Sequence, residues 1–351
     1  MNMIPDKPFK NYDEQLSRLR AHNILIPLNS ESFVKSQLSQ YGYYNIANAY
    51  QNMLPHDLME HYDPAVSVMS LIQLKWIDEA FSSVLLGALI HFENAFENSL
   101  GYHISRLFGV YAIGDDTHDG YLSRSHYPKR NFDPRPTLNR LEEFVTGTDP
   151  IHHQPSKMKV SSSILAYRQY HNHVPAWILL NEISLGLAKR WYSICPQEIK
   201  LAIIADLLGN TSALTDQEKL KLFHTTLNIV EGYRNGLAHG TSIWKTHVHQ
   251  SKKTSFSLSS EIVRLIKDSK IISTTDLRSN HGVNDIYAIL LILTSETQNF
   301  GGMHNILKNC QQIYQQSFEN QETRQSMFEH VLEFPSDFEL RLERLDKWYS
   351  Q

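Results

Sequence analysis

The sequence predicts an all-α fold, because helical periodicity dominates it and no convincing alternating strand pattern occurs. Apolar residues make up 41% of the 351 residues and charged residues 20%, which is the balance of a globular protein and not of a disordered chain. The longest apolar run, Val84 to Ile90, is too short to span a bilayer. We therefore expect a helical bundle that has no membrane segment.

Residues 1–60 are expected to form a small N-terminal helical element. A helix from Tyr12 to His22 follows Pro8. Ser30 is placed to cap a second helix that begins at Glu31, because a serine oxygen accepts the free backbone N–H groups of a first helical turn. A third helix is expected from Tyr43 to Met53.

Residues 61–351 are expected to form the main helical domain, with inserted loops at about 112–136 and 148–162 where Gly, Asp and Pro interrupt the periodicity. The longest helical pattern runs from Val66 to Phe108, and a break is expected in it near Trp76 or Gly87. The other helices are expected, in order, at Thr137–Val145, Trp177–Ser193, Pro196–Leu208, Asp216–Ala238, Ser259–Asp268, Asn284–Thr297, His304–Gln316 and Glu322–Leu332.

Charge and cysteine content narrow the function classes. A formal net charge of −4 argues against a protein that coats nucleic acid by bulk electrostatics, so any RNA contact must use local basic patches. The two cysteines, Cys195 and Cys310, exclude a disulfide scaffold and suit a reducing compartment. The residues after Met1 lack the pattern of a secretory signal, and we expect a cytoplasmic protein.

The hexapeptide Arg234-Asn235-Gly236-Leu237-Ala238-His239 lies at the end of one expected helix. It combines a permanent cation with the side chain that titrates near neutral pH. Cleavage of RNA without a metal needs these two groups, one to hold the phosphate and one to move a proton. The spacing alone is weak support, because 18 histidines produce such pairs by chance and two more occur, Arg168 to His173 and Arg324 to His330.

Helix geometry separates Arg234 from the other two arginines. At about 100° per residue, Arg234 falls on the narrow apolar face of its helix, where a cation needs an anionic partner. That face consists of Leu220, Phe223, Leu227, Val230 and Arg234, with Leu237 at its edge. A polar stripe beside it consists of His224, Asn228, Glu231, Asn235 and His239. Arg234 and His239 are about 140° apart on the helix, so they can converge only on a ligand that lies across it.

A purely structural interpretation of the same residues stays open. Arg234 would then form a salt bridge to a neighbouring helix, and the polar stripe would be a solvated face. Glu93 and Glu97 share a helix face like a carboxylate pair, but glutamates at this spacing are more often solvated or bonded to a neighbouring helix.

Two basic segments are candidate phosphate contacts, with a solvated basic loop as the alternative for each. The loop from Tyr121 to Arg140 interleaves cations with aromatic rings, which suits single-stranded nucleic acid. It contains Arg124, Lys129, Arg130, Arg135 and Arg140, together with Tyr127 and Phe132. The second segment directly follows the hexapeptide and contains Lys245, Lys252 and Lys253.

Closely spaced histidines raise the question of zinc. They occur at His152-His153, at His171 and His173, and at His247 and His249. Such pairs are expected when histidine is this abundant, and no cysteine pair accompanies them. We expect neither a metal nor any other cofactor.

The hexapeptide with Gly240 resembles the Arg-Asn-x-x-Ala-His signature of HEPN-type ribonucleases. Further blocks, in order along residues 7 to about 245, resemble the Abi-like abortive-infection proteins of the AbiD/AbiF type, which contain that fold. The blocks are Lys7-Pro8 with Glu14-Gln15-Leu16, the tyrosine-rich segment from Tyr41 to Tyr50, Phe92-Glu93-Asn94-Ala95-Phe96-Glu97, and Pro175-Ala176-Trp177 with Glu182-Ile183-Ser184-Leu185-Gly186. Where many relatives carry a basic residue, this chain has Glu97-Asn98.

The resemblance implies a HEPN-type helical bundle and a metal-independent endoribonuclease of phage defence. His239 would move the proton, Arg234 would hold the phosphate and Asn235 would position either group. Asn228, Glu231 and Glu182 are expected to support the site. HEPN sites are usually composite, so a homodimer is expected, and an antitoxin protein or a structured small RNA is a plausible partner. DNA should not be a substrate.

Two other functions compete with this interpretation. One is a non-catalytic RNA-binding protein of a defence ribonucleoprotein or toxin–antitoxin system, which would use the same residues without turnover. The other is a helical protein-interaction subunit that binds no RNA.

Overall fold

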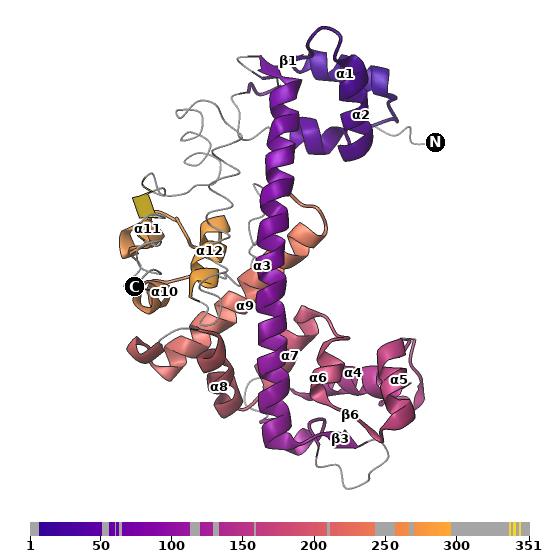
Figure 1. Cartoon of the computed structure of the whole chain (residues 1–351), viewed down its shortest axis with the longest axis vertical. Coiled ribbons are helices and arrows are strands. Elements are labelled where there is room, and N and C mark those ends of the chain that lie inside the picture. The colour runs from indigo at the N-terminus through magenta and orange to yellow at the C-terminus, as the bar shows by residue number, and fades with distance from the viewer. Residues whose placement is uncertain are drawn as a thin grey trace.

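Helices build most of the described fold, and the expected all-α class is confirmed (Figure 1). The one long helix, α3 (Val68–Phe108), runs nearly the full length of the molecule, and the other elements pack along it. The computed structural model describes residues 7–50, 56–59, 61–62, 65–112, 120–128, 133–157, 159–208, 211–242, 257–266, 270–295, 337, 340–341 and 344.

Helix α3 is continuous over 41 residues, so the expected break near Trp76 or Gly87 is wrong. A lone glycine inside a helix costs only about 1 kcal/mol. Helix α3 contributes buried side chains to two hydrophobic clusters, and this packing outweighs the cost of Gly87. Its start is capped by the Ser67 hydroxyl, which accepts the Met69 N–H at 3.2 Å, and it ends at Gly109, whose φ is +72°.

The N-terminal cluster forms around the first turns of α3. Helix α1 (Tyr12–Ala21) and helix α2 (Glu31–Tyr41) pack there with a π-helical turn, η1 (Tyr44–Asn48). Strands β1 (Ile24–Leu25) and β2 (Val66–Ser67) pair in parallel beside them. Because Leu71 and Ile72 of α3 belong to this cluster, its packing extends past residue 60.

One local expectation in this element fails, and a second is met only in part. Ser30 occupies the position before α2, but its hydroxyl donates to the Pro27 carbonyl at 2.7 Å and accepts no N–H of α2. The expected helix from Tyr43 to Met53 is described only as η1, and residues 51–55 lie outside the described residues. The cap that does form is that of α1, where Asn11 and Glu14 exchange hydrogen bonds in a capping box.

The larger hydrophobic cluster surrounds the rest of α3. Strands β3 and β6 pair antiparallel, as do β4 and β5. The elements after α3 are β3 (Tyr111–Ala112), η3 (Arg124–His126), α4 (Arg135–Thr146), β4 (Thr148–Asp149), β5 (Gln154–Pro155), α5 (Ser162–Tyr170), β6 (His173–Val174), α6 (Ala176–Leu180), α7 (Leu185–Ile194), α8 (Gln197–Leu207), η4 (Thr211–Ala213), α9 (Asp216–Ala238), α10 (Ser260–Leu265), α11 (Thr274–Arg278) and α12 (Ile286–Thr294).

Helix α9 has the expected bounds, whereas the helix expected at Trp177–Ser193 is two helices, α6 and α7. Ser184 is extended between them, and its hydroxyl caps α7 by accepting the Leu187 N–H at 3.3 Å. Helices α5 and α11 were not expected. The helices expected at His304–Gln316 and Glu322–Leu332 lie outside the described residues.

An aromatic cluster joins the three helices that carry or support the hexapeptide. Phe96 of α3, Tyr192 of α7 and Phe223 of α9 have ring centroids 5.4–6.1 Å apart and are buried. Beside them the Trp191 Nε1–H of α7 donates to the Tyr127 hydroxyl at 2.9 Å. This packing sets the position of α9 against α3.

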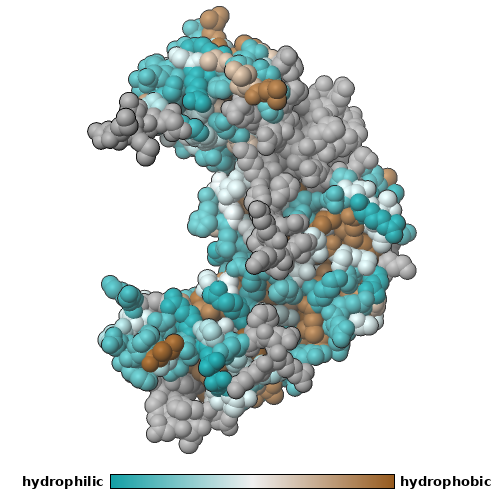
Figure 2. Space-filling view, turned by 180° about the vertical axis from the view of Figure 1, so that it is seen from behind, coloured by the Kyte–Doolittle hydropathy of each residue, from teal (hydrophilic) through white to brown (hydrophobic). Residues whose placement is uncertain are grey.

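The molecule has a crescent outline when seen from behind (Figure 2). The N-terminal element forms one end, the region of α4 to α6 forms the other, and a wide hollow lies between them. Helix α9 crosses α3 and ends on the side of α3 that faces this hollow (Figure 1). None of the helices in the described part of the chain combines the length and the apolar character needed to cross a membrane.

Candidate functional site

The end of α9 is shaped by Gly240, which follows the hexapeptide. Gly240 has φ +71°, and its N–H donates to the Leu237 carbonyl at 3.0 Å, while the Thr241 N–H donates to Gly236 at 2.9 Å. These two bonds form a Schellman motif, which favours glycine because the left-handed conformation strains a residue with a Cβ. Arg234 therefore lies in the last turns of α9, and His239 lies at the residue that ends the helix.

Arg234 has the anionic partner that its position demands. Its Nε–H donates to Oε2 of Glu93 on α3 at 2.8 Å. The Glu93 side chain is only 9% exposed and that of Arg234 is 35% exposed, so the pair lies at the edge of the α3–α9 interface. A second, longer bond of 3.4 Å runs from Arg234 Nη1 to Asn235 Oδ1.

The geometry of this pair leaves part of the guanidinium available. Glu93 occupies Nε, and Asn235 contacts Nη1, whereas Nη2 has no partner within the described residues. The planar fork of an arginine suits the oxygens of a phosphate. Glu93 thus orients Arg234 from the α3 side. The guanidinium can still bind an anionic ligand on its solvent side.

Glu97 lies one turn from Glu93 on α3 and is also buried. Its Oε1 has no hydrogen-bond partner within the described residues. Burial, followed by the negative charge of Glu93, raises the pKa of Glu97 to about 8, although the positive charge of Arg234 opposes the shift. Glu97 is therefore mostly protonated at pH 7. It adds no second full negative charge next to the Glu93–Arg234 pair.

This protonation predicts a pH dependence of stability. The folded-state pKa of Glu97 is above the unfolded value of 4.5, so the folded state holds a proton that the unfolded state releases. The stabilisation is present below about pH 4.5 and is lost as pH rises through about 8. We expect Glu97→Gln, which stays neutral, to lose less stability than wild type between pH 5.5 and pH 8.5. Urea unfolding at several pH values measures this, and parallel curves for the two proteins would contradict it.

His239 and Asn235 are exposed at the end of α9. Within the described residues no hydrogen bond to the His239 side chain is formed, and none joins it to Arg234. The two residues of the expected pair therefore share one helix end without a hydrogen bond between them in this part of the structure. A ligand that lies across this helix end is needed to contact both.

The residues of the polar stripe of α9 differ in whether they contact another helix. Asn228 and Glu231 both bind Lys189 of α7, whose Nζ donates to Asn228 Oδ1 at 2.8 Å and forms an ion pair with Glu231. Gly186 makes this approach possible, since a Cβ there would come within 2.5 Å of Glu231 Oε1. The expected supporting residues Asn228 and Glu231 therefore tie α9 to α7, and only the end of the stripe is open.

The other two members of the expected site have separate surroundings. His224 is exposed at its surface, and partial desolvation of the ring followed by the charges of Lys189 and Lys200 lowers its pKa, which favours the neutral ring. Glu182 is half-buried between α6 and α7, and no described hydrogen bond or ion pair links its side chain to α9.

The first basic segment is only partly available for RNA. Arg124 is exposed in η3, whereas Arg135 pairs with Asp133 at 2.6 Å and Arg140 pairs with Glu143 at 2.5 Å. Tyr127 is buried in the core, where its hydroxyl donates to the Tyr121 carbonyl at 2.6 Å, so the expectation that it stacks on a base is wrong. Lys129, Arg130, Phe132, Lys245, Lys252 and Lys253 lie outside the described residues.

The second Arg–His pair has a structural explanation. Arg168 Nη1 donates to the Val145 carbonyl at 3.0 Å, so the arginine satisfies the C-terminal end of α4. Arg324 and His330 lie outside the described residues. His152 is bonded to Asp149 at 2.7 Å, and the described part of the chain holds no group of three side chains suited to a metal.

Two residues near the hexapeptide could not be assigned from the sequence. Glu93 was recognised as half of a carboxylate pair, but its contact with Arg234 spans 141 residues of chain, and no local pattern encodes it. The contact of Lys189 with α9 was not predicted from the sequence. The available signal was that it follows Gly186 by one helical turn in α7, where a small residue marks a close helix contact.

Comparison with known families gives a match over the part of the chain that contains the candidate site. A family profile described as Abi-like protein matches residues 36–245, more than half of the chain, and includes both α3 and α9. Neither a search of curated proteins nor one of solved structures gave a match. The chain therefore belongs to the Abi-like protein family, which suggests a role in abortive infection, a form of phage defence.

Proposed function

We propose that this protein is a metal-independent endoribonuclease of HEPN type that acts as an abortive-infection effector. The observation that carries the proposal is the arginine of the hexapeptide: Glu93 anchors its Nε at 2.8 Å, and its Nη2 has no partner among the described residues, at the helix end that also carries the exposed His239. An anchored guanidinium and an exposed imidazole at the same helix end suit phosphoryl transfer, in which positioning and charge stabilisation dominate.

The proposed reaction uses the 2′-hydroxyl of RNA as its nucleophile. The 2′-oxygen attacks the adjacent phosphorus and loses its proton, and the bond from phosphorus to the 5′-oxygen breaks. His239 moves a proton at the 2′-oxygen or at the leaving 5′-oxygen, and Arg234 stabilises the charge that develops on the phosphate. The products are a 2′,3′-cyclic phosphate and a 5′-hydroxyl. DNA has no 2′-hydroxyl and should not be cut.

The separation of Arg234 and His239 within one protomer supports a composite site. Both lie at the end of α9, and no hydrogen bond joins them among the described residues. A second copy that brings its own α9 to the same phosphate would let Arg234 of one protomer act together with His239 of the other. We propose a cytoplasmic homodimer, held in check by an antitoxin or a small RNA. A species that is monomeric at the assay concentration and still cleaves RNA would contradict the dimer.

The same separation also favours the second candidate function, RNA binding without turnover. One assay distinguishes the two functions. Purified protein is incubated with a single-stranded RNA and with DNA of the same sequence, in the presence of EDTA. We expect the RNA to be cut to products with 2′,3′-cyclic phosphate ends and the DNA to stay intact. Intact RNA that is nevertheless bound would favour the non-catalytic function, and failure to bind RNA would reject both.

A further inference from the structure

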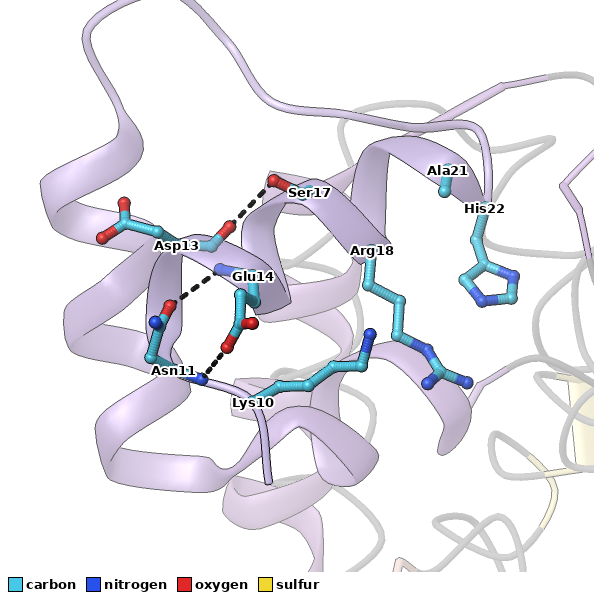
Figure 3. Close-up of a pocket in the computed structure, with 8 residues that line it drawn as sticks. All are labelled: Lys10, Asn11, Asp13, Glu14, Ser17, Arg18, Ala21 and His22. Atoms are coloured by element: carbon cyan, nitrogen blue, oxygen red, sulfur yellow. Dashed lines mark hydrogen bonds between the residues drawn. The ribbon is translucent and has the colours of Figure 1, made fainter. Parts of the chain in front are cut away.

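Helix α1 lies far along α3 from the end of α9 (Figure 1). A pocket on this helix is lined by residues that precede those matched by the family profile. It opens on one face of α1, and Figure 3 shows its side chains. The pocket is lined by Lys10, Asn11, Asp13, Glu14, Ser17, Arg18, Ala21 and His22.

The two acids of the pocket already have partners. Asp13 forms an ion pair with Lys35 of α2 at 2.5 Å. Glu14 is held by the capping box of α1, in which its Oε2 accepts the Asn11 backbone N–H at 2.7 Å (Figure 3). The Asp13 carboxylate is therefore paired outside the pocket, and Oε2 of the Glu14 carboxylate, which keeps its charge, is bonded to the backbone at the start of α1.

Its two permanent cations have no such partners. Within the described residues neither Lys10 nor Arg18 forms an ion pair, and Arg18 Nε is buried without a hydrogen-bond acceptor. The Arg18 guanidinium lies over the Tyr43 ring, 5.7 Å from its centre. Stacking of this kind leaves the N–H groups at the edge of the guanidinium free for an anion. The side chains of Lys10, Arg18 and His22 extend to the same side of α1 in Figure 3.

We propose that this pocket is a second RNA-binding site, in which Lys10 and Arg18 hold a backbone phosphate. An arginine fork and a neighbouring ammonium match the oxygens of a phosphodiester. The adjacent Tyr44 supplies the feature that points to single-stranded nucleic acid: it is 61% exposed, and its ring lies 6.1 Å from that of Tyr43. An exposed ring beside a phosphate site offers a platform for base stacking. This proposal rests on RNA as the ligand of the protein, and it does not require cleavage.

The test measures the binding of a fluorescent single-stranded RNA by the full chain carrying His239→Ala, at several salt concentrations. We expect Lys10→Gln with Arg18→Gln to raise Kd about 10-fold and to reduce the slope of log Kd against log salt by about 1.4, since each lost phosphate contact on a single strand contributes about 0.7. Tyr44→Ala should raise Kd about 10-fold without a change of that slope, because stacking carries no charge.

Arg20→Gln is the matched control. Arg20 lies on the same helix, but it pairs with Glu31 and does not line the pocket. Its substitution should leave Kd and the salt slope unchanged. Lys10→Gln alone changes one half-buried side chain that lies outside the hydrophobic clusters, so its expected several-fold rise in Kd does not depend on folding.

Equal losses for Arg20→Gln and the double variant would mean diffuse electrostatics and would overturn the proposal. An unchanged Kd in the double variant, or no RNA binding by the parent protein, would also overturn it. These outcomes are distinct from a failure of the proposed ribonuclease, which would show as intact RNA whatever the pocket residues do.

Discussion

Replacing His239 by alanine is expected to lower the rate of RNA cleavage by about 10²–10⁴-fold, the usual contribution of a general acid or base. Stability should change little, because His239 is exposed and the Schellman motif that ends α9 uses backbone groups of Gly236, Leu237, Gly240 and Thr241. The measurement is the rate at which 2′,3′-cyclic phosphate ends form at saturating RNA, together with the urea midpoint of each protein.

Arg234→Ala is the companion variant, and we expect it to lower the rate by about 10²–10³-fold through loss of charge stabilisation. Arg168→Ala serves as the matched control, because Arg168 also precedes a histidine by five residues but binds the end of α4. That variant should cleave RNA at the wild-type rate. Activity that survives in both Arg234→Ala and His239→Ala would remove the hexapeptide from the mechanism.

Phe96→Ala is expected to destabilise the fold by about 3–5 kcal/mol, the usual cost of deleting a buried phenylalanine ring. Phe96 is fully buried on α3, and its ring contacts Tyr192 of α7 and Phe223 of α9. The deletion leaves a cavity where three helices meet, so the position of α9 against α3 is lost with it. The free energy of unfolding in urea measures the effect.

Ile90→Ala provides the control on the same helix. Ile90 is 41% exposed, so its truncation should change stability by no more than about 0.5 kcal/mol. Comparable losses in the two variants would show that the aromatic cluster contributes no more to stability than an exposed position of α3 does.

Local signals in the chain were sufficient for the existence and bounds of α9. Thr215 and Glu218 form a capping box at its start, and Gly240 ends it, and all three act through contacts within a few residues. Local signals misled where long-range packing decides. Gly87 predicted a break in α3, but the two clusters along this helix stabilise it by more than a glycine costs.

The same division holds for the candidate site. The need of Arg234 for an anionic partner follows from its place on an apolar helix face, because an unpaired cation there is costly. The identity of the partner does not follow, since Glu93 is 141 residues away and only the packing of α3 against α9 selects it. At Tyr127 the local sequence misled. Its neighbours in the sequence are basic and predicted an RNA contact, but the fold places Tyr127 in the core, where its hydroxyl accepts the Trp191 Nε1–H.

By itself the sequence determined the all-α class, the helix that carries the hexapeptide and the chemical types of its two candidate functional side chains. These depend on periodicity, capping and side-chain chemistry, which are properties of short segments. The tertiary structure alone decided that Glu93 orients Arg234 and that burial and Glu93 keep Glu97 protonated. It also decided that Lys10 and Arg18 share a pocket whose two acids have other hydrogen-bond or ion-pair partners. Such features arise from charge and burial between distant segments, and no local pattern encodes them.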